Sequence, residues 1–166
     1  MKKSKKISIS ALLAAMCVAI HAMGSLMESL DFSLAVISGL LVYVLSVEYG
    51  DRMAMGVFGV AGILSLLLPL KTPAVFFLCF FGWYPVAQKK IRKLPPILCR
   101  IIKFLLFNAV FALLLFLSAL VTQTRELWWI YAALAVLGNL CFVLYDLLLD
   151  RFLIWYLLKL RKRLRL

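Results

Sequence analysis

Six apolar runs fill most of this 166-residue chain, and they constrain its fold more than any other feature. Hydrophobic residues make up 66% of the sequence and charged residues only 16%, whereas a soluble domain is about 45–50% apolar and roughly 25% charged. A chain of this length forms about one domain, which cannot bury so much apolar surface in a single small core. The composition therefore excludes a soluble enzyme, a secreted disulfide scaffold and a disordered tail, and it leaves a small polytopic membrane protein.

The apolar runs predict membrane-spanning helices. A helix needs about 20 mostly apolar residues to cross a bilayer, and about 17 is the lower limit. The runs predict six spans, over residues 7–27, 32–49, 53–70, 74–87, 97–121 and 127–149. The first run follows four lysines and could mimic a secretory signal, but no Ala-x-Ala cleavage pattern lies near its end. We therefore interpret it as a span.

The fourth run is shorter than this limit, and the distribution of charge decides whether it crosses. With six crossings, the outer side keeps only Lys71 and Arg125 of the 19 Lys and Arg residues. Without the fourth crossing, the basic stretch 89–103 would face outward, although cytoplasmic loops normally carry the positive charge. We therefore predict an all-α, polytopic integral membrane protein with six transmembrane helices and both termini cytoplasmic. Residues 1–166 form a single six-helix membrane domain, in which residues 150–166 are a basic interfacial C-terminal tail.

The net charge of +12 would suggest nucleic acid as the partner of a soluble protein. Here the basic residues lie between and after the apolar runs, which is the pattern of loops held at an anionic inner leaflet. We therefore expect anionic lipids at the cytoplasmic face, and no nucleic acid. The four cysteines form no Cys-x-x-Cys pair and the chain has one histidine, so the usual metal sites cannot be assembled. We predict neither a metal nor a cofactor.

A stripe of small residues runs along the first predicted span. Ala11, Ala15 and Ala19 recur every four residues, so they share one face of a helix. Small side chains let a second helix approach closely, which is how helices associate in lipid. Packing within this chain is the simpler interpretation of the spacing alone, and docking of a separate membrane helix is the alternative.

Polar and aromatic side chains gather in two predicted outer loops and at the span ends beside them. The first hairpin supplies His21 and Glu28, and the last one supplies Gln123, Arg125, Trp128 and Tyr131. Deeper in the sixth span, Asn139 shares the helical face of Trp128, and a polar residue there should point into the bundle. The alternatives are interface anchoring for the aromatic rings, hydrogen-bonded packing for His21, and hydrogen bonding between helices for Asn139.

The chain resembles the membrane-embedded substrate-capture subunits, or S components, of energy-coupling factor vitamin transporters. Those proteins are similar in size, have six spans with both ends inside, and carry an alanine-x-x-x-alanine motif in the first span. In that family the motif docks on a shared transmembrane coupling subunit, and Ala11, Ala15 and Ala19 match it here. The resemblance implies a multi-pass protein of a bacterial plasma membrane. It would capture a small water-soluble vitamin or related micronutrient on the outer side and deliver it with the coupling subunit and two ATPases.

The resemblance and the placement of the polar groups together predict the functional residues. Substrate binding is assigned to His21, Glu28, Gln123, Arg125, Trp128, Tyr131 and Asn139. Partner docking is assigned to Ala11, Ala15 and Ala19. No vitamin-specific signature is recognisable, so the identity of the ligand stays open.

Two other classes of protein remain as alternatives. One is a structural or scaffold membrane protein of a cell-envelope assembly, and the other is a membrane-embedded enzyme of unrecognised type. The sequence contains no His-Glu-x-x-His motif and no P-loop, which excludes the usual membrane zinc proteases and ATP hydrolysis by the chain itself. We therefore predict no enzymatic activity and no catalytic residue. A retained small molecule would favour capture, and an empty outer cavity would favour a scaffold.

Overall fold

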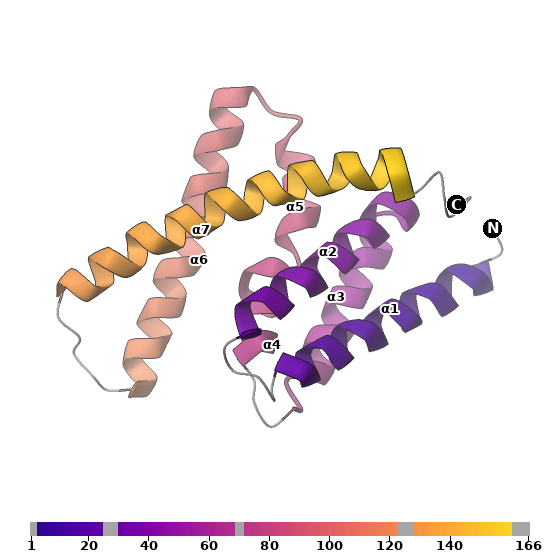
Figure 1. The fold of residues 1–166 in the computed structure, drawn as a ribbon, viewed down its shortest axis with the longest axis horizontal. Coiled ribbons are helices and arrows are strands. Elements are labelled where there is room, and N and C mark those ends of the chain that lie inside the picture. The colour runs from indigo at the N-terminus through magenta and orange to yellow at the C-terminus, as the bar shows by residue number, and fades with distance from the viewer. Residues whose placement is uncertain (1–2, 25–29, 69–71, 123–127, 161–166) are drawn as a thin grey trace. The chain divides into compact units, whose positions relative to one another are not determined.

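The computed structural model describes residues 3–24, 30–68, 72–122 and 128–160 (Figure 1). All elements in these ranges are helical, which confirms the prediction of an all-α fold there. They are α1 (Lys3–Gly24), α2 (Asp31–Tyr49), α3 (Asp51–Ser65), α4 (Thr72–Phe76), η2 (Phe77–Phe81), α5 (Tyr84–Ile91), α6 (Pro96–Thr122), α7 (Trp128–Trp155) and η3 (Tyr156–Leu160). The chain divides into two compact units, Met1–Cys99 and Arg100–Leu166.

Four helices of the described residues are long and apolar enough to cross a membrane. They are Ser4–Gly24, Asp31–Tyr49, Pro96–Ala119 and Trp129–Lys159, and they overlap the first, second, fifth and sixth predicted spans. The third and fourth predicted spans do not correspond to helices of this length. Helix α3 has 15 residues, which extends about 22 Å against a hydrocarbon core of about 30 Å. The fourth is not one continuous α-helix.

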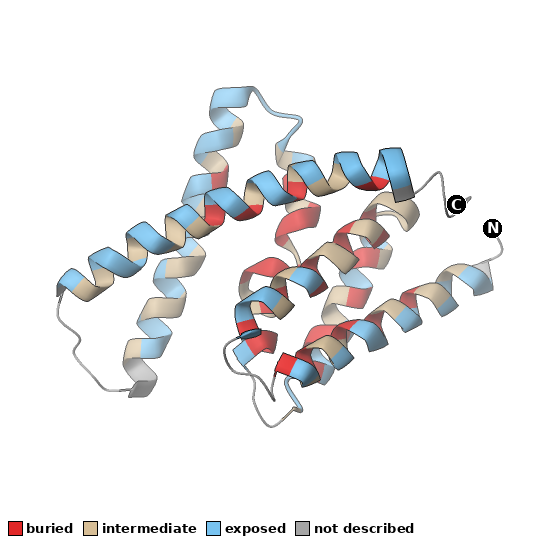
Figure 2. Ribbon diagram, in the orientation of Figure 1, coloured by how far each residue is buried: buried red, intermediate tan, exposed pale blue. Residues whose placement is uncertain are grey.

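The first unit is built on the mutual packing of α1, α2 and α3. Helix α1 contributes Ala14, Cys17 and His21, which are buried and recur at helical spacing. Small residues on the facing helices, such as Ala35 and Ala61, are also fully buried. Because such side chains let helix backbones approach closely, they suit a core formed between apolar helices. Figure 2 shows buried stretches, in red, on the helices of this unit.

The segment α4–η2–α5 is interrupted, and the sequence supplies the cause. Pro85 has no N–H and lies at the start of α5, so it cannot continue an α-helix from the preceding turn. The chain instead widens into the π-turn η2, where the Gly82 N–H donates to Phe77 O at 2.8 Å. The Trp83 indole N–H donates to the Cys79 carbonyl at 2.9 Å, which satisfies a backbone oxygen at the break.

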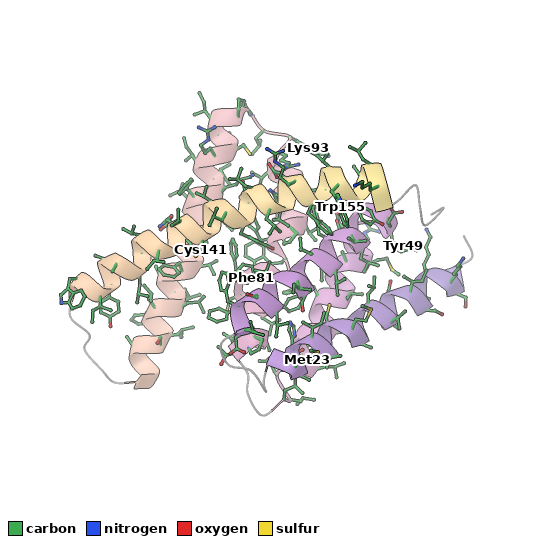
Figure 3. All side chains as sticks on the ribbon, in the orientation of Figure 1. Met23, Tyr49, Phe81, Lys93, Cys141 and Trp155 are labelled. Carbon is green, nitrogen blue, oxygen red and sulfur yellow. The ribbon has the colours of Figure 1, made fainter. Side chains whose placement is uncertain are left out.

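This broken segment lies within the core of the first unit rather than on its surface. Most residues from Pro73 to Gln88 are buried, and the Phe81 ring packs edge-on against Phe32 of α2 with centroids 4.8 Å apart (Figure 3). A Cβ at Gly82 would collide with the Phe58 ring and lie 2.9 Å from Phe77 Cζ. Glycine is therefore required there because aromatic rings occupy the space of a side chain.

A cluster of three side chains, the corner clip, ties α5 to the turn between α2 and α3. It consists of Ser46, Asp51 and Lys89. The Lys89 ammonium donates to Asp51 Oδ1 at 2.8 Å and to Ser46 Oγ and O at 3.0 Å each, while the Ser46 hydroxyl donates to Asp51 Oδ1 at 2.6 Å. These hydrogen bonds hold the pKa of the Asp51 carboxyl below its usual value. The turn itself needs Gly50, whose φ of 94° is unfavourable for residues with a Cβ.

The second unit contains most of α6 and all of α7. The Phe107 and Phe142 rings stack with centroids 4.6 Å apart, and Phe111 lies against Gly138, where a Cβ would be 3.0 Å from its ring. Helix α7 does not end near residue 149, where the sixth span was expected to leave the membrane. It runs to Trp155, and the π-turn η3 continues to Leu160. The rest of the predicted basic tail lies outside the described residues.

Candidate functional site

His21, one of the predicted substrate-binding residues, lies in the centre of the first unit. It is 0% exposed. Its Nδ1 lies 2.7 Å from Ser65 Oγ of α3, and its ring meets Phe77 edge-on with centroids 4.8 Å apart. The imidazole therefore joins α1, α3 and η2, which is the hydrogen-bonded packing that the sequence offered as the alternative. A role in binding stays a prediction.

Two buried polar atoms of the first unit, one of them on this histidine, have no described hydrogen-bond partner. Among the described residues, His21 Nε2 and Ser38 Oγ are buried and have no hydrogen-bond partner. Ser38 lies close to α1, because its carbonyl oxygen accepts a hydrogen bond from Cys17 Sγ at 3.8 Å. We call His21, Ser38 and Ser65 the buried polar centre. An unsatisfied buried donor or acceptor costs about 1–3 kcal/mol, so each of these two atoms calls for an explanation.

The pairing of Ser65 with His21 does not amount to a catalytic dyad. A nucleophilic serine needs an accessible hydroxyl, a histidine base and a third group that orients the imidazole. Both residues are 0% exposed, and the second ring nitrogen of His21 has no described partner. The arrangement can hold a polar group of a ligand that enters the core, but in this structure it presents no nucleophile to a substrate.

Asn139 lies in the second unit and pairs with Asn108 across α6 and α7. The two amides exchange hydrogen bonds, with nitrogen–oxygen distances of 3.0 and 3.1 Å. Each amide also donates to a carbonyl of its own helix four residues earlier, that of Phe104 or Ala135, at 2.9 Å. The Asn139 nitrogen thus uses both of its protons inside the protein. A ligand that accepts a hydrogen bond from this nitrogen would have to displace Asn108 or the Ala135 carbonyl, so substrate binding by Asn139 stays a prediction.

The remaining predicted binding residues are not brought together by the described structure. Tyr131 lies half-buried on α7, about 12 Å along the helix from Asn139. Glu28, Gln123 and Arg125 lie outside the described residues, and so does the side chain of Trp128, whose backbone begins α7. That the binding residues of the two predicted outer loops form one site therefore stays a prediction.

The stripe assigned to partner docking lies on the outer face of α1. Ala11, Ala15 and Ala19 are all exposed, whereas Ala14 and Cys17 on the opposite side of the helix are buried. No described helix of the first unit covers the stripe. Packing within the first unit therefore does not account for the stripe, and packing within the whole chain, which the spacing alone favoured, stays an alternative.

Ion pairs connect elements that are distant in sequence within the described ranges. One belongs to the corner clip, and another joins the Lys103 ammonium to both carboxylate oxygens of Asp146, at 2.9 and 2.8 Å. Within the described ranges, no three His, Cys, Asp or Glu side chains lie together in a way that could hold a metal ion.

No family model, curated protein or solved structure matches the chain. The function is therefore inferred from the sequence pattern and from the geometry above.

Proposed function

We propose that this chain is the substrate-capture subunit of an importer of the energy-coupling factor type. It binds a small water-soluble vitamin or related micronutrient on the outer side of a bacterial plasma membrane. A transmembrane coupling subunit and two ATPases then complete the import. The observation that carries the proposal is the exposed alanine stripe on α1, on the face opposite the one that packs into the unit.

The physical argument concerns what an exposed small-residue face does in lipid. Lipid tails are as apolar as any side chain, so a helix facing lipid gains nothing from being narrow. A narrow face does gain when another helix packs against it, because backbone atoms then come into van der Waals contact. Ala11, Ala15 and Ala19 cover about 12 Å of helix, which is long enough for one helix to cross. This supports docking of a partner helix on α1.

The proposal includes six crossings with both termini in the cytoplasm. The charge distribution supports this, since only Lys71 and Arg125 would remain outside. Burial of the broken segment supports it as well, because irregular backbone is tolerated at membrane depth only when protein or water shields it from lipid. A short α3 also fits a subunit that reorients in the membrane, as mismatch costs only fractions of a kcal/mol per Å.

The buried polar centre supplies a second line of support. The Nε2 atom of His21 can donate or accept a hydrogen bond, and the Oγ atom of Ser38 belongs to a hydroxyl group. Neither atom has a described hydrogen-bond partner. Polar groups inside a membrane bundle commonly mark substrate pathways. A small hydrogen-bonding ligand that reached either atom would satisfy it.

The direct test is whether the protein holds a ligand. Protein purified gently from the membranes of its own cells should retain a small water-soluble molecule, seen as a constant mass addition in native mass spectrometry. Uptake of that molecule should require co-expression of the coupling subunit and ATPases. If no molecule is retained and co-expression gives no uptake of any tested vitamin, the chain is not a capture subunit and the scaffold alternative is favoured.

The proposed topology has its own prediction. A cysteine introduced at Thr124 should react in intact cells with a membrane-impermeant thiol reagent, and one introduced at Lys90 should not. The parent protein, with its four native cysteines, gives the background of labelling. Labelling at Lys90 together with protection at Thr124 would show that the protein has the opposite orientation. Labelling at both positions would show that the predicted span between them does not cross the membrane.

A further inference from the structure

A groove outside the proposed transport machinery lies between α3 and α5, beside the corner clip. It has a volume of about 480 Å³ and is open to the surface on one side. It is lined by Asp51, Arg52, Met55, Trp83, Val86, Ala87 and Lys90. All of these residues belong to the first unit.

The lining of the groove carries more positive charge than negative charge, with Arg52 and Lys90 against Asp51. Asp51 is the only acid in the lining, and its carboxylate is already bound by Lys89 and Ser46 of the corner clip. Arg52 and Lys90 are both exposed, and neither forms an ion pair of 4 Å or less with a described residue. Two cations therefore remain available to an anion.

The rest of the groove is apolar. Met55 on one side and Val86 and Ala87 on the other form its walls, and the Trp83 ring completes them. Trp83 is held in place by its indole hydrogen bond to Cys79 O, so this wall is rigid. Tryptophan is enriched where a helix passes from hydrocarbon to headgroups. A ligand that fits must therefore have an anionic end and an apolar body.

We infer that this groove binds one anionic phospholipid, with its phosphate between Arg52 and Lys90 and an acyl chain along Met55, Trp83 and Val86. A phosphate accepts charge-assisted hydrogen bonds from both cations. The chain covers apolar side chains that would otherwise meet headgroups and water. This site differs from the general attraction of a basic surface to anionic lipid, because it depends on two particular cations. It does not depend on transport.

The test measures lipid binding to the full-length protein in a neutral detergent by native mass spectrometry. The probes are dioleoyl phosphatidylglycerol and, as the uncharged comparison, dioleoyl phosphatidylcholine. The variant Arg52→Gln/Lys90→Gln should lower the affinity for phosphatidylglycerol about ten- to thirtyfold, from about one kcal/mol per basic residue. Its affinity for phosphatidylcholine should stay unchanged.

The matched control is Lys5→Gln/Lys6→Gln, which removes two positive charges from the first turns of α1 and leaves the groove intact. This variant should bind phosphatidylglycerol as the parent does. Equal loss of affinity in the two double variants would show attraction to net charge alone and would overturn the inference. An unchanged thermal midpoint of Arg52→Gln/Lys90→Gln shows that weaker binding does not come from misfolding, and both substituted residues are at the surface.

A soluble phosphate ester could supply the same anion, and a competition experiment separates the two sources. Glycerol phosphate at millimolar concentration should not displace phosphatidylglycerol, because it lacks the acyl chain that fills the apolar walls. Glycerol phosphate could instead displace phosphatidylglycerol at the same concentration at which phosphatidylglycerol itself binds. That result would assign the groove to a soluble phosphate and overturn the inference that it binds a phospholipid. Met55→Glu should weaken phosphatidylglycerol binding, since it places a carboxylate on the path of the chain.

Discussion

Replacing Asp146 with alanine is expected to destabilise the pairing of α6 and α7 by about 3–5 kcal/mol. Asp146 binds the Lys103 ammonium through both carboxylate oxygens, and the two side chains are 22% and 10% exposed. The substitution leaves an ammonium group without a counter-ion at a site with little access to solvent. The free energy of unfolding in mixed micelles, measured by denaturant titration of the intact protein, checks this value.

Two further variants separate the loss of the pair from the loss of one charge. The double variant Lys103→Met/Asp146→Leu removes both charges and keeps most of the volume, so it should recover most of the lost stability. Arg151→Ala removes an exposed charge further along α7 and should change stability by less than about 0.5 kcal/mol. A double variant as unstable as Asp146→Ala would mean that the site needs a charge pair, and not merely the absence of an unpaired charge.

Hydrophobic run length predicted the long helices well. The run 32–49 became α2 (Asp31–Tyr49), and the run 97–121 became α6 (Pro96–Thr122). Both runs are bounded by residues that stop or open a helix, since Gly50 adopts a positive φ and Pro96 suits a first helical turn. The all-helical class of the fold follows from the composition and the length of the hydrophobic runs. Both are properties of neighbouring residues along the chain and need no knowledge of which helices meet.

Run length did not predict the structure of the third and fourth runs. Helix α3 ends at Ser65, five residues before the expected end of its span. The sequence marks Gly82 and Pro85 as breaking residues, but nothing in it predicts a π-turn at Phe77–Phe81 closed against the Phe58 ring. That geometry is set by side chains from another helix, and a single sequence does not show which helices meet.

The pairings of polar residues were only partly predictable. The sequence put Asn139 on an inward face of its span, and the structure pairs its amide with that of Asn108 on α6. The sequence assigned Lys103 only to a basic cytoplasmic stretch, so its ion pair with Asp146 was missed. A usable signal existed, because in the predicted spans both residues lie within two turns of the cytoplasmic end. Matching the depth of opposite charges on successive spans would have found it.

The prediction most specific to the proposed function is that Ala15→Leu weakens docking of the coupling subunit. Ala15 lies in the middle of the exposed stripe of α1, and a leucine there would hold an approaching helix away from the backbone. Overpacking of a close contact costs about 1–3 kcal/mol, so the affinity for the coupling subunit should fall about ten- to a hundredfold. Co-purification of the subunit and ATPases with the tagged chain, and ATP-dependent uptake of the retained ligand, both measure this.

The control distinguishes docking from stability and from ligand binding. Ile37→Phe enlarges an exposed apolar residue on α2, away from the stripe, and should leave both the complex and uptake intact. Ala15→Leu should keep the ligand bound to the isolated subunit, because the stripe is on the side of α1 opposite His21 and the core. If the complex survives enlargement of Ala11, Ala15 and Ala19 together, no helix packs on this face. The stripe would then face lipid, and the resemblance on which the function rests would lose its residue-level support. Loss of ligand together with the complex would instead place Ala15 in the structure of the binding unit, because a docking surface can be blocked without disturbing the site that it serves.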